Sequence, residues 1–184
     1  MNILKLSRIR IFLFTGVLVP NIVFSQKILM SKKDNIENST IYLTDMLKLV
    51  AVKSAPVIQI VGWMKVKADT VNDVRFSFLT PAVRLEQNTL VDTFHAECLL
   101  KTQAGELITG IYKGDSKAVI EGKYVHSYSF QFSWEDIIKL SNAIVTDLKI
   151  MPPSGEGGTF EVDKKYQTNV SRLSQLLIRT KGSK

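Results

Sequence analysis

The stretch YVHSYSFQFSWEDIIKL, residues 124–140, decides the fold class. In its first half, aromatic side chains recur at every second position, which is the alternation of a strand with one buried face. This face carries Tyr124, His126, Tyr128, Phe130 and Phe132. Ser133 is typical of a helix N-cap, and Asp136 follows where a carboxylate is favoured near the positive end of a helix. The stretch therefore predicts a strand that leads into a short helix at 134–142.

The same alternation recurs on both sides of this stretch. Residues 57–66 and 144–150 alternate apolar with polar side chains, as a half-buried strand does. Residues 91–112 hold two such runs around Gly105, which favours a hairpin. Lys113-Gly114-Asp115-Ser116 is predicted as a further turn.

Two other segments have helical spacing. Apolar residues recur at intervals of three and four near 41–51 and near 169–180. They are Leu43, Met46, Leu47 and Val50 in the first segment, and Val170, Leu173, Leu176 and Leu177 in the second. We therefore expect a mainly β (α+β) fold, an antiparallel β-sandwich or curled sheet with two or three short helices.

The first 25 residues have the layout of a secretory signal peptide. Three basic residues precede an apolar run that closes at Phe24-Ser25-Gln26. The run is too short to cross about 30 Å of hydrocarbon, which favours cleavage after Ser25 over a retained anchor. The expected organisation is a signal peptide at 1–25, a flexible polar leader at 26–39, and one β-rich domain at 40–184 that ends in a helix.

Charge and cysteine content narrow the class of protein. The chain carries a net charge of +7 at pH 7, of which residues 1–25 hold three basic residues and no acidic one. Ordinary solubilising charge explains the mildly basic remainder; an anionic membrane surface or an acidic glycan as a partner is the alternative, while export argues against nucleic acid. Cys98 is the only cysteine, so no internal disulfide forms. Its apolar neighbours predict a buried, slowly reacting thiol.

Candidate binding residues gather on the polar faces of two strands. Trp63 shares one such face with Lys65 and Lys67, where an indole beside lysines suits a carbohydrate or protein contact. A second layer that covers this face is the alternative. His95 and Glu97 lie two apart on another strand, although a solvated strand face also explains that pair.

The sequence holds no recognisable catalytic, metal or cofactor motif. Gly114-Asp115-Ser116 superficially resembles the surroundings of a serine nucleophile, but the glycines of an oxyanion hole and an orienting acid are missing. We therefore predict no catalytic residue, no metal and no cofactor. The alternative is a small envelope enzyme with scattered residues, which a cleft uniting His95, Glu97 and His126 would favour.

The order of elements over residues 94–150 resembles a pattern in uncharacterised exported bacterial envelope proteins. The pattern consists of the hairpin around Gly105, the aromatic strand, the helix after Ser133 and the strand at 144–150. The resemblance implies a small β-rich envelope domain and brings no functional residues.

The predicted function is an exported, non-catalytic protein of the Gram-negative periplasm or cell surface. It would act as a binding or assembly module that contacts another protein or a surface glycan. A structural subunit of an envelope machine is a further alternative.

Overall fold

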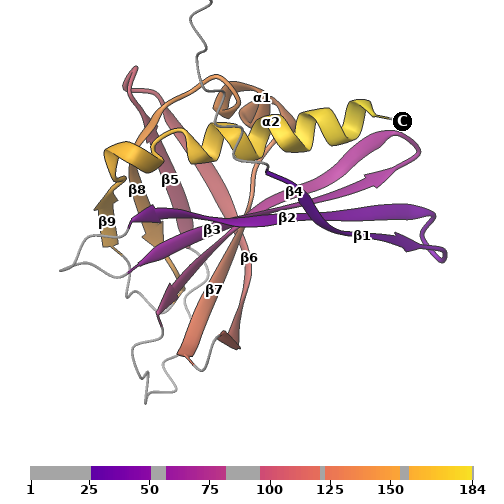
Figure 1. Cartoon of the computed structure of the whole chain (residues 1–184), viewed down its shortest axis with the longest axis horizontal. Coiled ribbons are helices and arrows are strands. Elements are labelled where there is room, and N and C mark those ends of the chain that lie inside the picture. Colours follow the sequence, from indigo (N-terminus) through magenta and orange to yellow (C-terminus); the bar gives the residue numbers. More distant parts are fainter. Residues whose placement is uncertain (1–25, 51–56, 82–95, 121–122, 154–157, 184) are drawn as a thin grey trace, which may run out of the picture.

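The computed structural model describes residues 26–50, 57–81, 96–120, 123–153 and 158–183, which form one antiparallel sheet and two α-helices (Figure 1). The nine strands follow the order β1-β2-β3-β4-β7-β6-β5-β8-β9, and the sheet does not close into a barrel. Their bounds are β1 Ile28–Asp34, β2 Ser39–Val50, β3 Ile58–Lys67, β4 Thr70–Pro81, β5 Glu97–Thr102, β6 Leu107–Ile120, β7 Lys123–Gln131, β8 Val145–Met151 and β9 Gly158–Glu161. The predicted mainly β fold is confirmed.

Both predicted helices after the aromatic stretch are confirmed. Helix α1 spans Trp134–Leu140, and the Ser133 hydroxyl accepts a hydrogen bond from the Asp136 amide at 3.0 Å. Helix α2 spans Asn169–Gly182 and follows a 3-10 turn at Lys164–Tyr166. Figure 1 shows α2 lying across the sheet, where it packs on β2, β3 and α1.

The core lies between the helices and one face of the sheet, which we call the inner face. Phe76 and Phe78 of β4 pair with Phe130 and Tyr128 of β7, and all four side chains are buried. Leu173 of α2 is fully buried in the same core cluster. Because strand side chains alternate, the residues between these aromatics point to the outer face, away from the helices.

The helix predicted near 41–51 is wrong, because residues 39–50 form strand β2. Register shifts between Leu43 and Met46, and again before Val50, interrupt the strand alternation. Such bulges place apolar residues three or four apart and so imitate helical spacing. Leu49, which the helical pattern left out, is fully buried, while Met46 is 36% exposed.

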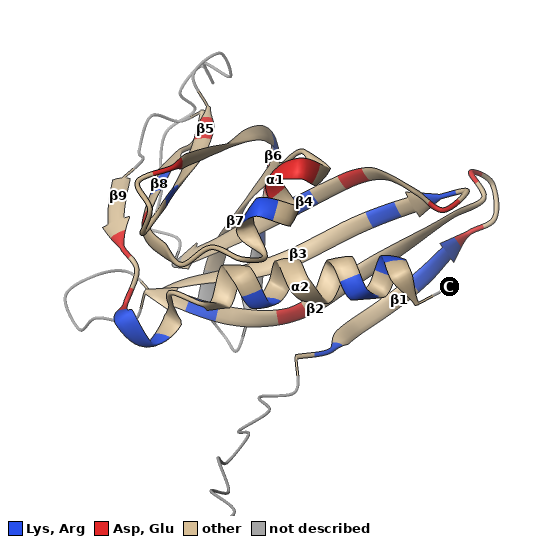
Figure 2. Ribbon diagram, turned by 90° about the horizontal axis from the view of Figure 1, so that it is seen from above, with Lys and Arg blue, Asp and Glu red and all other residues tan. Residues whose placement is uncertain are grey.

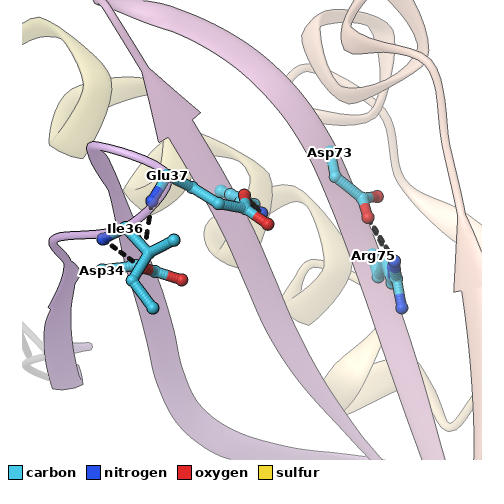
Figure 3. A network of polar contacts seen from close by, with 6 residues as sticks. Asp34, Ile36, Glu37, Asp73 and Arg75 are labelled. Carbon is cyan, nitrogen blue, oxygen red and sulfur yellow. Dashed lines mark hydrogen bonds and ion pairs between the residues drawn. The ribbon is translucent and has the colours of Figure 1, made fainter.

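The flexible leader predicted at 26–39 is also wrong. Residues 28–34 form edge strand β1, which pairs with β2. Asp34 Oδ1 accepts hydrogen bonds from the Ile36 and Glu37 amides in the connecting turn (Figure 3). Most side chains of β1 are exposed, so main-chain pairing orders this strand without an apolar pattern.

The turn predicted at Lys113-Gly114-Asp115-Ser116 is wrong as well, since β6 runs through it. The register with β7 shifts between Tyr112 and Gly114, and Gly114 has φ +139. Glycine here serves a β-bulge instead of a chain reversal. The hairpin prediction is confirmed for β5 and β6, with Gly105 at φ +85 in the turn. Its first residues, 91–95, lie outside the described part.

Candidate functional site

An open hollow of about 350 Å³ lies on the outer face of the central strands. Four serines line it, together with larger side chains. We call it the serine hollow; its lining residues are Leu43, Trp63, Arg75, Ser77, Lys113, Gly114, Asp115, Ser116, Ser127 and Ser129. A hollow with an aromatic wall, hydroxyl groups and two basic residues is suited to a polar ligand.

Strand pairing brings the serines together. Ser77 of β4 lies opposite Ser129 of β7, and their hydroxyl oxygens are 3.2 Å apart. Ser127 of β7 lies opposite Ser116 of β6. Each serine is next in sequence to a residue that points to the inner face, so its own small side chain points to the outer face. Because these side chains on three neighbouring strands are small, the outer face is hollowed above them.

Arg75 is held in place at the wall of the hollow. Its Nε donates to Asp73 Oδ2 at 2.8 Å, and Nη2 contacts the same oxygen (Figure 3). The guanidinium carbon lies 4.8 Å from the ring centroid of Trp63, a cation–π arrangement. Both named nitrogens face Asp73, while Nη1 makes no hydrogen bond with the described residues. Arg75 therefore offers a positioned positive charge, and among the described residues its Nη1 has no acceptor.

The structure brings one predicted binding residue to this hollow. Trp63 is half-buried in its wall, as its place on the polar face of β3 indicated. Lys65 forms an ion pair with Glu37, and Lys67 is exposed at the end of β3, so neither lines the hollow. Glu97 is half-buried on the outer face of β5, also outside the hollow. His95 lies outside the described residues.

Sequence reasoning missed Arg75, Lys113 and the serines. The alternation of serine with phenylalanine at Ser77 and Ser129 was visible, but only the pairing of β4 with β7 makes the two serines neighbours. Lys113 was placed in a turn, and the bulge instead puts it beside the hollow. The signal present in the sequence is the alternation of small polar residues with large aromatic ones along each strand.

A second polar cluster lies on the inner side of β6 and β7. Asp115 accepts a hydrogen bond from the Tyr112 hydroxyl at 2.5 Å and contacts His126 Nε2 at 2.8 Å. His126 Nδ1 lies 2.9 Å from the Tyr128 hydroxyl. The Tyr112 hydrogen bond is the main cause that lowers the pKa of Asp115, and burial is the main cause that raises the pKa of Tyr112.

This cluster argues against the enzyme alternative as the sequence framed it. Both ring nitrogens of the buried His126 have protein partners, so neither faces a substrate. His126 points to the inner face of the sheet, whereas Glu97 and Ser116 point to the outer face. The described residues include no group of three metal-ligating side chains.

Cys98 is buried, as its apolar neighbours predicted. It is fully buried in the core cluster. Burial, with a smaller effect of the neighbouring Glu97 charge, raises the pKa of the thiol well above its ordinary value. A thiol held in its protonated form is a poor nucleophile.

Comparisons with family models, curated proteins and solved structures find no match to this chain. In the part of the chain that the structure describes, no helix is long and apolar enough to cross a membrane.

Proposed function

We propose that this protein is an exported, non-catalytic envelope module that binds an anionic, hydroxyl-rich glycan in the serine hollow. The observation that carries the proposal is the position of Arg75, which Asp73 and Trp63 hold beside four serine hydroxyls. Export is supported by the layout of residues 1–25.

The charges and hydroxyls of the hollow favour a ligand with acidic groups. Arg75 and the exposed Lys113 are its basic residues, and the carboxylate of Asp73 pairs with Arg75. Asp115 also lines the hollow, but its carboxylate is bound by Tyr112 and His126. The hydroxyls of Ser116 and Ser127 make no side-chain hydrogen bond with the described residues, and each can donate to or accept from a sugar. The half-buried Trp63 indole adds an apolar surface against which a sugar ring can pack.

Fluorescence of a single tryptophan tests this proposal. Trp134 lies on α1 beside Lys181, on the helix side of the sheet, so a Trp134→Phe chain reports on Trp63 alone. We expect dextran sulfate to change the emission of Trp63 and uncharged dextran to leave it unchanged. Equal binding of both polymers would exclude anion recognition, and binding of neither would leave a protein contact as the better interpretation.

A pair of lysines on β6 supplies the matched control. Lys113 lines the hollow, whereas Lys117 is exposed and lies opposite His126 on the inner side. Lys113→Glu should weaken binding by about tenfold, and Lys117→Glu by less than about twofold, because only the first charge faces the ligand. Equal losses would point to unspecific attraction by net charge.

A further inference from the structure

A second hollow, of about 520 Å³, opens between the start of α2 and residues 45–48 of β2, which lie beyond the first residue of β1. We call it the Asp45 hollow. Asp45 of β2 and Gln26 lie in its wall, together with the basic residues Lys48, Lys165 and Arg172. In Figure 2 the acidic band of β2 lies beside the basic bands of α2.

Two polar atoms in this wall are buried and have no hydrogen-bond partner within the described part of the chain. Asp45 Oδ1 and Gln26 Nε2 make no hydrogen bond with the described residues. The three basic residues are exposed, and none of them forms an ion pair with Asp45 in that part of the chain. A buried carboxylate oxygen without a donor is unfavourable, so this position is suited to a cationic donor that can reach it.

The backbone of residue 26 is already close to Asp45. The Asp45 amide donates to the Lys27 carbonyl at 3.0 Å, so Gln26 is one residue from a direct contact. Hydrolysis of the Ser25–Gln26 bond consumes one water and leaves a carboxylate on Ser25 and an α-ammonium on Gln26. The new group carries a positive charge and three donors where an amide nitrogen had one.

We propose that the Asp45 hollow is the binding site for the α-ammonium of Gln26, with Asp45 Oδ1 as its acceptor. This inference rests on the proposed export, which creates the new terminus. Lys48, Lys165 and Arg172 oppose a further positive charge, but water screens their exposed groups more than it screens the buried Asp45 oxygen. Cleavage after Ser25 would thus create a contact that fixes the start of edge strand β1 against β2.

A thermodynamic cycle tests the pairing. Chains that begin at Gln26 with a free amine are compared with chains that carry a Gly-Ser extension, each with Asp45 or with Asp45→Asn. At pH 6 the free amine should raise the ratio of folded to unfolded protein by about tenfold, equivalent to about 1.4 kcal/mol. Asp45→Asn should abolish that difference. A tenfold gain that persists in Asp45→Asn, or no gain with Asp45 present, would overturn the inference.

Asp73 provides a matched control for the carboxylate. It also carries a buried oxygen without a partner in the described residues, but it lies on β4 and pairs with Arg75. Asp73→Asn should leave the tenfold effect of the free amine intact. Loss of the effect in both variants would show a general consequence of removing a carboxylate, and would contradict a specific site.

Titration of the Gln26 α-amine tests the pairing with Asp45 without any substitution. An ammonium paired with Asp45 has a folded-state pKa above its unfolded value of about 7.7. The stabilisation is then complete below that value and disappears as the pH rises through the folded pKa. NMR titration of the α-amine should therefore give a raised pKa; an ordinary value would overturn the pairing.

Mass analysis of the native protein separates this inference from the proposed export. A native chain that begins elsewhere than Gln26 overturns both. A chain that begins at Gln26 but is lighter by one ammonia has cyclised its terminus and lost the amine, which overturns the inference alone. A native chain with an intact Gln26 amine, together with a positive cycle, supports both.

Discussion

Replacement of Leu173 by alanine should cost about 3 kcal/mol of the free energy of unfolding. Leu173 is fully buried where α2 packs on the sheet. The change removes three carbon atoms, worth about 2.4 kcal/mol at about 0.8 kcal/mol each. The cavity left behind adds to this loss, which brings the estimate into the range of about 2 to 5 kcal/mol measured for buried leucines.

Leu176 is the matched control, since it is the same residue type on the same helix. Its side chain is only half-buried. Leu176→Ala should therefore cost roughly half as much or less, because less apolar surface returns to water on unfolding. Denaturant unfolding of both variants, followed by circular dichroism, measures the difference. Equal and small losses would refute the docking of α2 as a core element, and would favour a detachable helix that binds a partner.

Three further outcomes follow from the packing and the charges. Gly110→Ala should destabilise the fold by about 1 to 3 kcal/mol, because a Cβ there would lie 2.6 Å from Cζ of the buried Phe132; Gly182→Ala, with open space around it, should cost little in the same thermal melts. Asp115→Asn should remove a stabilisation that the wild type has above a pH of about 4 and loses as the pH falls through the lowered pKa of Asp115. A difference in stability between the two proteins that is the same at all pH values would contradict the cluster. Cys98 should react with maleimide only after denaturation, and rapid labelling of the folded protein would contradict its burial.

Elements with a strong local pattern could be predicted from the sequence. The aromatic strand β7 and the cap at Ser133 follow from side-chain alternation and from one hydroxyl, both of which are local properties. Strand β2 could not be recognised, because its bulges depend on pairing with β3. Strand β1 lacked any apolar signal, since an edge strand with two exposed faces needs only main-chain partners.

The serine hollow shows the same limit at the level of the site. Trp63 could be placed on the correct face from alternation alone. Arg75 could not be connected with it, since the two residues become neighbours only through the register of β3 with β4. The serines likewise come from three strands whose order, with β7 between β4 and β6, is a property of the whole sheet.

The bulge in β6 links the two faces of the sheet. In a regular strand, residues three apart point to opposite faces, so Tyr112 and Asp115 would be separated. One extra residue between them turns both side chains inward, where Asp115 bonds to Tyr112 and to His126. The same bulge leaves Lys113 and Gly114 at the serine hollow on the other face. Because Gly114 has a φ of +139, a conformation that side chains with a Cβ rarely adopt, a single glycine maintains both the inner cluster and the wall of the outer hollow.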